Sequence, residues 1–163
     1  MVCIMNEALE LQTGQKVLEV GAGTGYHAST VAEVVAPLAE PRAKWGHVWA
    51  VEIVPQLANL AKRNVEQLGY GERVTVIQGD GSMGLPEYAP FDRVLVTAAA
   101  PDVPEPLTEE LKPGGILLIP VGDLRYFQEL LKVKKAPDGS LSSEHLGGVA
   151  FVPLRGKKGW RSL

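Results

Sequence analysis

The sequence predicts an α/β fold, with a mainly parallel β-sheet and helices on both of its faces. Three observations carry this prediction: apolar runs alternate with helical patterns along most of the chain, the first run leads straight into a glycine-rich turn, and the next two runs are followed by an acidic residue. Parallel strands are buried on both faces and therefore read as continuous apolar runs. Strands that alternate with helices along a chain pair in parallel, because each helix crosses back over the sheet.

The composition is that of a globular domain, which we expect to be a single one spanning residues 1–163. Hydrophobic residues make up 45% of the 163 residues, enough for a full core, and the chain is too short for two ordinary domains. The net charge is −3 without a basic tail, which argues against nucleic acid as the main partner. No apolar run reaches the roughly 18 residues of a membrane span, and the N-terminus lacks a signal-peptide pattern. We therefore expect a soluble, cytoplasmic protein without a membrane partner.

Metal and disulfide chemistry are not expected. Cys3 is the only cysteine, which excludes an internal disulfide and a multi-cysteine metal site. His27, His47 and His145 are widely spaced and form no H-x-x-x-H pair, so no metal site is predicted. His27 directly follows the glycine-rich turn and is a candidate for lining a pocket; plain packing at a helix start is an equally weighted alternative.

The first half of the chain alternates helices and strands. Residues 2–12 carry apolar residues at helical spacing, and residues 37–46 read as a surface loop because they hold two prolines and a closing glycine. The helix at residues 55–68 begins on a proline and is followed by a glycine, which suit the first turn and the end of a helix. The remaining elements are strands at residues 16–20, 47–51 and 73–77, read from their apolar runs, and a helix at residues 26–35.

The second half adds two more strands of the parallel sheet and ends in an antiparallel pair of strands. A fourth apolar strand is predicted at residues 91–96, followed by a proline-rich loop and a short helix at residues 107–111. The sequence Lys-Pro-Gly-Gly at residues 112–115 predicts a turn into a fifth strand. That strand covers residues 116–121, and an antiparallel pair with an Asp-Gly turn between its strands follows at residues 126–135 and 145–153.

The turn between the first strand and its helix is the first candidate ligand site. Gly21, Gly23 and Gly25 stand there with the spacing G-x-G-x-G, and Glu19 lies two residues before the first of them. Glycine allows positive φ and lets a ligand lie against the backbone, and a strand–turn–helix unit places the turn at the carboxyl edge of the sheet. A dinucleotide site prefers G-x-G-x-x-G, but Tyr26 occupies the position of its third glycine. A tight turn without a ligand is the alternative.

The pattern E-x-G-x-G-x-G resembles motif I of the S-adenosyl-L-methionine-dependent methyltransferases. The resemblance implies that the turn, with Ala22 and Thr24 between its glycines, holds the methionine part of the cofactor, and that Glu19 acts through polar contacts near it. The nucleoside part of such a cofactor needs hydrogen-bond acceptors, and two acidic residues further along the chain are candidates.

Glu52 comes directly after the predicted strand at residues 47–51. Asp80 comes directly after Gly79, the first glycine that follows the predicted strand at residues 73–77. A carboxylate after the second strand can accept hydrogen bonds from both ribose hydroxyls of a nucleoside; the alternative for Glu52 is an exposed acid that favours the dipole of the next helix. Asp80, which precedes Gly81, is a candidate acceptor for the adenine amino group, although Asp-Gly is also an ordinary turn pair. Thr97 and residues 98–100 are small, which leaves room where cofactor and acceptor must meet.

Longer stretches resemble the protein-L-isoaspartate O-methyltransferase family and together cover nearly the whole chain. The most specific are Val-Thr-Ala-Ala-Ala-Pro at residues 96–101 and Val-Pro-Leu at residues 152–154, within the closing motif at residues 151–156, and the others are residues 7–11, 17–28, 79–81, 91–95 and 111–115. The resemblance implies a Rossmann-like class I methyltransferase fold. Its mostly parallel seven-stranded sheet would have an altered order of the last strands and an antiparallel C-terminal pair.

The resemblance also implies a function, the repair of aged proteins by methylation of the carboxylate of isomerised aspartates. The cofactor would be S-adenosyl-L-methionine, and the partners would be isoaspartyl-containing proteins or peptides. Ala98, Ala99 and Val152 are then expected at the substrate, where backbone groups near Val152 pair with an extended peptide. Because a carboxylate is already ionised at neutral pH, no general base is required, and positioning supplies most of the catalysis.

The sequence departs from the family pattern at its N-terminus. In the family, a segment before the first helix carries a loop whose hydroxyl residue lies over the methyl-transfer site, and this sequence begins after that loop. The family's active-site serine therefore has no counterpart here, and Ser29 and Ser82 are not its equivalents, so the catalytic residue is unassigned. Impaired transfer is expected if these 163 residues are the whole protein. A relative that binds the cofactor without transfer activity, and a methyltransferase for another substrate, are the alternatives.

Overall fold

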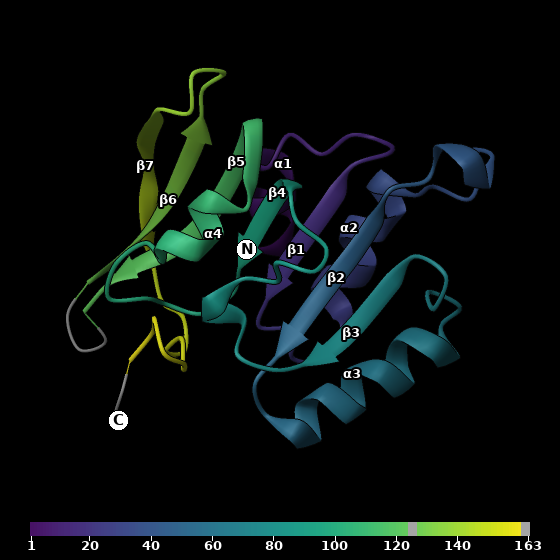
Figure 1. Cartoon of the computed structure of the whole chain (residues 1–163). Helices are drawn as coiled ribbons and strands as arrows, with labels where there is room; N and C mark the ends of the chain where they lie inside the picture. The colour runs from purple at the N-terminus through teal and green to yellow at the C-terminus, as the bar shows by residue number, and fades with distance from the viewer. Residues whose placement is uncertain (124–126, 161–163) are drawn as a thin grey trace.

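A seven-stranded β-sheet runs through the molecule in the computed structural model, which describes residues 1–123 and 127–160 (Figure 1). The N-terminal elements are α1 (Val2–Ala8), β1 (Lys16–Val20), α2 (Tyr26–Val35), a 3-10 turn η1 (Arg42–Lys44), β2 (His47–Glu52) and α3 (Pro55–Gln67). They are followed by β3 (Val74–Gln78), a 3-10 turn η2 (Gly81–Met83), β4 (Phe91–Val96), α4 (Glu105–Glu109), β5 (Leu111–Gly122), β6 (Gln128–Lys135) and β7 (Leu141–Val149).

The strands are arranged in the order β3-β2-β1-β4-β5-β6-β7. The first five of them along the chain pair in parallel, so the carboxyl ends of β1, β2 and β4 lie at one edge of the sheet. β6 is antiparallel to β5, and β7 is antiparallel to β6. The predicted mostly parallel seven-stranded sheet with an antiparallel C-terminal pair is therefore confirmed, with the last three strands in simple sequence order.

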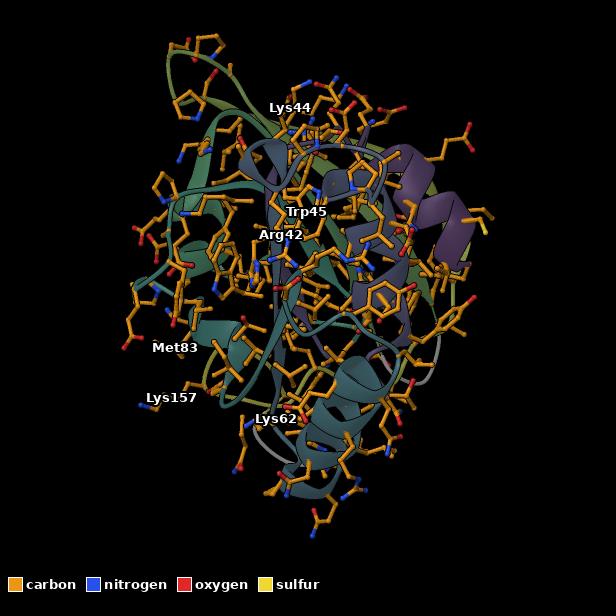
Figure 2. The ribbon with its side chains drawn as sticks, turned by 90° about the vertical axis from the view of Figure 1, so that its right-hand side faces the viewer. Arg42, Lys44, Trp45, Lys62, Met83 and Lys157 are labelled. Carbon is orange, nitrogen blue, oxygen red and sulfur yellow. The ribbon has the colours of Figure 1, made fainter. Side chains whose placement is uncertain are left out.

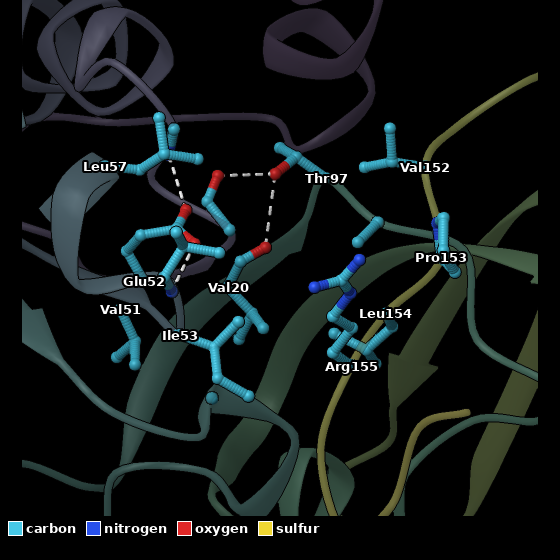
Figure 3. A pocket seen from close by; sticks show the side chains of 15 residues that line it. Val20, Val51, Glu52, Ile53, Leu57, Thr97, Val152, Pro153, Leu154 and Arg155 are labelled. Atoms are coloured by element: carbon cyan, nitrogen blue, oxygen red, sulfur yellow. Dashed lines mark hydrogen bonds between the residues drawn. The ribbon is translucent and has the colours of Figure 1, made fainter. Parts of the chain in front are cut away.

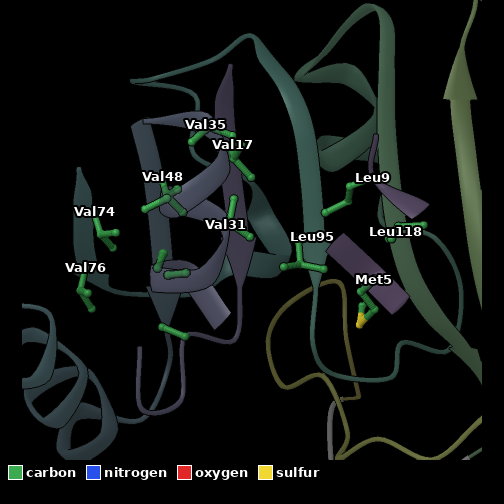
Figure 4. Close-up of a cluster of buried hydrophobic side chains, with 14 of the residues drawn as sticks. Met5, Leu9, Val17, Val31, Val35, Val48, Val74, Val76, Leu95 and Leu118 are labelled. Atoms are coloured by element: carbon green, nitrogen blue, oxygen red, sulfur yellow. The ribbon is translucent and has the colours of Figure 1, made fainter. Parts of the chain in front are cut away.

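The core consists of two apolar clusters, one on each face of the sheet. Side chains of β1 alternate between them, because Val17 belongs to one cluster and Leu18 to the other. The first cluster is covered by α1 and α2, with Met5 and Val31 pointing at the sheet, and receives residues of α3 (Figure 4). The second lies under α4, whose Leu107 is fully buried. The helices therefore fix the sheet from both faces and leave its carboxyl edge accessible.

The first helix is shorter than the predicted residues 2–12, because it ends at Ala8. Glu10 has a φ of 52°, which is outside the helical region. The buried guanidinium of Arg93 donates hydrogen bonds to the backbone carbonyls of Leu9 and Glu10 and so replaces the next helical turn. Arg93 lies on β4, far along the chain, so the local pattern at residues 2–12 does not show where the helix stops.

The C-terminal strands differ most from the predicted boundaries. The expected turn at residues 112–115 is an irregular part of β5, where Gly114 has a φ of 79° and the pairing with β4 shifts. The final strand was expected at residues 145–153 but is Leu141–Val149, and it is exposed along almost its whole length. An edge strand exposed on both faces has no hydrophobic pattern to mark its start. The first strand of the pair begins at Gln128, and Tyr126, where it was expected to begin, is outside the described residues.

The other boundaries shift by one or two residues. The fourth helix covers Glu105–Glu109 instead of residues 107–111, and β2 includes Glu52 as its last residue. In the predicted loop at residues 37–46, the Trp45 indole N–H donates to the carbonyls of Pro37 and Glu40, and Arg42 stacks on its ring (Figure 2). The Trp45 side chain thus connects the two ends of this loop. Over the described residues, no helix is long and apolar enough to cross a membrane, and no group of three or more potential ligands could hold a metal ion.

Candidate functional site

A pocket of about 470 Å³ lies at the carboxyl ends of β1, β2 and β4 (Figure 3). Its floor comes from the strand ends and the glycine turn, and one wall comes from the C-terminal segment, here defined as residues 152–160. The described residues that line it are Val20, Gly21, Gly23, Val51, Glu52, Ile53, Val54, Leu57, Gly81, Thr97, Ala98, Val152, Pro153, Leu154 and Arg155. Most of these are apolar or present only backbone, so a ligand here would meet few but well-placed polar groups.

The glycine turn is held open by hydrogen bonds to the neighbouring strand. The backbone N–H groups of Gly21 and Ala22 donate to the carbonyl of Val51 at 2.8 and 3.1 Å. Gly21 has a φ of 100°, and a Cβ there would lie 2.5 Å from Thr97 Oγ1. A Cβ on Gly23, whose φ is 55°, would meet no atom within 4 Å. Gly21 is therefore required for close packing, whereas Gly23 keeps space open at the pocket.

Glu52 connects the glycine turn to the start of α3. Its side chain is 6% exposed, and it lines the pocket. One carboxylate oxygen accepts the backbone N–H of Gly23 at 2.8 Å, and the other accepts that of Val54 at 3.0 Å. Two fixed bonds orient the carboxylate while each oxygen keeps a further lone pair for a ligand. Glu52 therefore faces the pocket with an oriented carboxylate and also orders the glycine turn, while its role as an acceptor for ribose hydroxyls stays a prediction.

Glu19 lies fully buried on β1 and does not line the pocket among the described residues. Neither of its carboxylate oxygens has a hydrogen-bond partner in the part of the chain that the structure describes. Burial in the first place, and the charge of Glu52 in the second, raise the pKa of Glu19 well above its ordinary value. A fully buried carboxyl group without a partner is unusual, and it lies directly behind the glycine turn.

Thr97 ties β4 to the glycine turn, because its hydroxyl donates to the carbonyl of Gly21 at 2.7 Å. Ala98 lines the pocket, but Ala99 is fully buried and its backbone is already paired. The N–H of Ala99 donates to the carbonyl of Val152 at 2.7 Å, and its carbonyl accepts the N–H of Leu154 at 2.8 Å. Ala99 therefore holds the C-terminal segment in place, while the Val152 side chain, 69% exposed, remains at the pocket.

Asp80 lies beside the pocket and anchors the C-terminal segment. Its Oδ1 accepts the N–H and the hydroxyl of Ser82, and its Oδ2 accepts the backbone N–H of Lys157 at 2.8 Å. A Cβ on Gly156 would lie 2.1 Å from Asp80 Oδ1, so only glycine allows this approach. Gly81 lines the pocket, and a Cβ there would collide with Val20. The sequence showed the Asp-Gly pair but not its link to the C-terminus, which is a tertiary contact.

Two predicted residues face a different groove. Thr24 and Gly25 line a depression between α2 and α3, together with Tyr26, Asn64 and Tyr70. Ala22 is buried in the first core cluster. The structure therefore brings together in the pocket, of the predicted site residues, Gly21, Gly23, Glu52, Gly81, Thr97, Ala98 and Val152.

Sequence reasoning gave no role to several residues of the pocket. Ile53 lies just before α3 and Leu57 in its first turn, and they remain 38% and 37% exposed although they are apolar. An apolar residue directly after Glu52 is the only local signal for this surface. Leu154 and Arg155 stand in a conspicuous C-terminal motif, but nothing in its sequence indicates that it turns back to the pocket.

His27 is not among the described residues that line the pocket, so the packing alternative applies to it. Its Nε2 lies 2.8 Å from Asn6 Oδ1, and the Asn6 amide donates to Thr30, which joins α1 to α2. The side chain is 8% exposed. Burial, with the N-terminal charge as a second cause, lowers the pKa of His27 to about 4.

This pKa shift predicts acid sensitivity. Below pH 6.5 His27 is protonated in the unfolded chain, whereas in the folded chain it becomes protonated only near pH 4. The free energy of unfolding therefore falls as the pH is lowered through this window. Between pH 7.5 and 4.5, we expect the wild type to lose roughly 2–3 kcal/mol more unfolding free energy than His27→Gln. Urea unfolding at both pH values measures this difference. Equal losses in wild type and His27→Gln would contradict the assignment.

Comparison with known proteins places the sequence of this chain in a family. The family model described as "Protein-L-isoaspartate(D-aspartate) O-methyltransferase (PCMT)" matches residues 1–159. A protein-L-isoaspartate O-methyltransferase of Hyperthermus butylicus is 58% identical over 161 residues, which cover 99% of this chain and 66% of that protein. The chain thus spans about two thirds of the length of this relative.

Solved structures of the same family resemble this fold. A protein-L-isoaspartate O-methyltransferase superposes with a TM-score of 0.85 at 34% identity, over 97% of this chain and 47% of that one. A candidate protein-L-isoaspartate O-methyltransferase from Plasmodium falciparum, solved with S-adenosyl-L-homocysteine, gives 0.78 at 25% identity, over 94% and 71%. Sequence and fold agree with these matches, and the chain belongs to the protein-L-isoaspartate(D-aspartate) O-methyltransferase family.

Proposed function

We propose that this chain binds S-adenosyl-L-methionine in the pocket at the ends of β1, β2 and β4 and transfers its methyl group to the carboxylate of isoaspartyl residues in damaged proteins. The observation that carries the proposal is the Glu52 carboxylate, which the Gly23 and Val54 amides fix at the wall of that pocket. The family and the names of its relatives supply the reaction, and the chain spans 66% of the Hyperthermus butylicus protein.

Several residues of the pocket, and two acidic residues outside its lining, fit the cofactor. Glu52 offers two oxygens to the ribose hydroxyls, and Gly23 leaves the space that the amino-acid part needs. Ile53 and Leu57 give an apolar surface suited to the base. The buried carboxyl group of Glu19 lies behind the glycine turn without a partner in the described structure, and a cationic amino-acid group bound at that turn would favour its ionised form. Asp80 lies beside the pocket; its Oδ1 accepts two hydrogen bonds and its Oδ2 one, so Oδ2 keeps one lone pair for the adenine amino group.

When bound, the cofactor supplies a methyl group activated by its positively charged sulfur. The protein's part is to position the cofactor and the acceptor carboxylate and to exclude water from between them. Thr97 and Ala98 keep side chains small at the end of β4, and Thr97 fixes the glycine turn through its hydroxyl. An isoaspartyl carboxylate is already ionised at pH 7, so no general base is needed. Most of the rate enhancement comes from holding the methyl donor and the carboxylate in line.

The proposal is tested by two measurements on one preparation. Calorimetry with S-adenosyl-L-homocysteine should show binding that depends on Glu52. Incubation with methyl-labelled cofactor and an isoaspartyl peptide should give a labelled methyl ester, and the same peptide with normal aspartate should give none. If this chain and a version extended upstream by the family's N-terminal segment are both silent, the transferase proposal fails. Binding without transfer in both would identify the second candidate, a cofactor-binding relative.

The partners and location remain predictions. Isoaspartyl-containing proteins are the proposed acceptors because the relatives carry the corresponding name. A cytoplasmic location follows from the sequence expectation alone, and fractionation of the cells that make the protein would test it.

A further inference from the structure

The pocket has a second charged side chain that the proposed cofactor does not require. Among the described residues that line it, only Glu52 and Arg155 carry a charge. Glu52 belongs to the glycine-turn side, whereas Arg155 comes from the C-terminal segment on the opposite wall (Figure 3). In that view the Arg155 side chain extends from its segment into the pocket, with its guanidinium turned toward Val20 and Thr97. One anionic and one cationic group therefore face the same space from two walls.

The Arg155 guanidinium has no partner within residues 1–123 and 127–160. Arg42, Arg73 and Arg93 each form an ion pair or hydrogen bonds with protein groups, but Arg155 forms neither with any described residue. The residue is exposed overall, so its charge keeps contact with water while no ligand is present. A solvated guanidinium at a pocket wall has five donors ready for a planar anion and carries no burial penalty beforehand.

The backbone that presents Arg155 is anchored on both sides. Before it, the N–H of Leu154 donates to the carbonyl of Ala99 at 2.8 Å. After it, the N–H of Lys157 donates to Asp80 at 2.8 Å and the indole N–H of Trp160 donates to the carbonyl of Ala99 at 3.0 Å. The segment is therefore fixed against the ends of β3 and β4, and Arg155 is directed at the pocket by a rigid support, as a recognition residue needs to be.

We infer that Arg155 is a specificity-determining residue that binds the acceptor carboxylate and orients it in the pocket. This inference rests on the proposed function, because it assigns the acceptor side of the same site. A guanidinium matches the two oxygens of a carboxylate with parallel hydrogen bonds. It distinguishes an isoaspartyl carboxylate from the neutral amide of the same shape, which offers only one acceptor oxygen and no charge. The exposed Val152 lies beside it on the same wall and offers apolar contact to the peptide.

The test uses two synthetic peptides, one with an isoaspartyl carboxylate and a twin in which that group is a carboxamide. Their binding is measured by fluorescence anisotropy with and without saturating S-adenosyl-L-homocysteine. We expect the wild type to prefer the carboxylate peptide by roughly fivefold to tenfold, and less at high salt. Arg155→Gln should remove this preference, and Arg155→Lys should retain part of it, since a point charge remains without the planar fork.

The matched control is Lys157→Gln, which removes a cation from the same segment. Lys157 is exposed, points outward (Figure 2), and contacts Asp80 through its backbone, which the substitution keeps. This variant should keep the full preference. Arg155→Gln that keeps the preference, or a wild type that has none, overturns the inference.

Calorimetry with S-adenosyl-L-homocysteine on each variant separates the two proposals. Unchanged cofactor affinity in Arg155→Gln, together with a lost carboxylate preference, is the expected result. Cofactor affinity that falls while the peptide preference stays would place Arg155 at the cofactor and overturn the inference. A wild type that binds no S-adenosyl-L-homocysteine would refute the proposed function, and the peptide titrations without cofactor would still decide the role of Arg155.

Discussion

Gly23→Val should abolish S-adenosyl-L-homocysteine binding while the chain remains folded. A Cβ at this position meets no atom within 4 Å, so the valine fits against the protein but stands in the space of the pocket that Gly23 lines. At a φ of 55° the substitution also strains the backbone, by about 1–2 kcal/mol. Calorimetry measures the loss of binding, and thermal unfolding measures the remaining stability.

The matched control is Gly69→Val, after the end of α3. Gly69 has a φ of 80°, and a Cβ there also meets no atom within 4 Å, but the residue does not line the pocket. This variant should show a similar loss of stability and wild-type affinity. If Gly23→Val bound S-adenosyl-L-homocysteine as the wild type does, the glycine turn would not be the cofactor site.

Glu52→Ala should weaken S-adenosyl-L-homocysteine binding by about 1–3 kcal/mol, or roughly fivefold to 150-fold in Kd. Two losses contribute: the acceptors for the ribose hydroxyls disappear, and the N–H groups of Gly23 and Val54 lose the carboxylate that orders them. Glu52→Gln, with one acceptor oxygen in the same shape, should have an intermediate affinity.

Glu110→Ala is the control for the lost backbone hydrogen bond. The Glu110 carboxylate accepts the N–H of Leu85 at 2.7 Å and does not line the pocket among the described residues. It should lower the melting temperature without changing the cofactor affinity. Equal affinities of Glu52→Ala and wild type would show that the ribose assignment is wrong.

The sequence could predict the parallel part of the fold because its signals are local. Continuous apolar runs mark buried strands such as β1, and three glycines in five residues mark the turn that follows. The end of α1 could not be predicted, because Arg93 from β4 supplies the groups that stop it. β7 was misplaced because a strand exposed on both faces carries no burial pattern.

The candidate site likewise contains residues that local sequence patterns predict and residues that only tertiary contacts place. Glu52 and Gly23 were named from their position after a strand, and the parallel pairing of β1 with β2 brings them within 2.8 Å. Arg155 was read only as part of a motif, because its approach to the pocket depends on contacts with Ala99 and Asp80 made far away in sequence. Local patterns thus predict the floor of the pocket, whereas its C-terminal wall is a product of tertiary packing.

A crystal structure of this chain with S-adenosyl-L-homocysteine tests the central claim most directly. The account predicts the ribose hydroxyls at the Glu52 carboxylate and the amino-acid part against Gly21 and Gly23. Density for the ligand in the groove of Tyr26, Asn64 and Tyr70, or a nucleoside that leaves Glu52 without a contact, would contradict it.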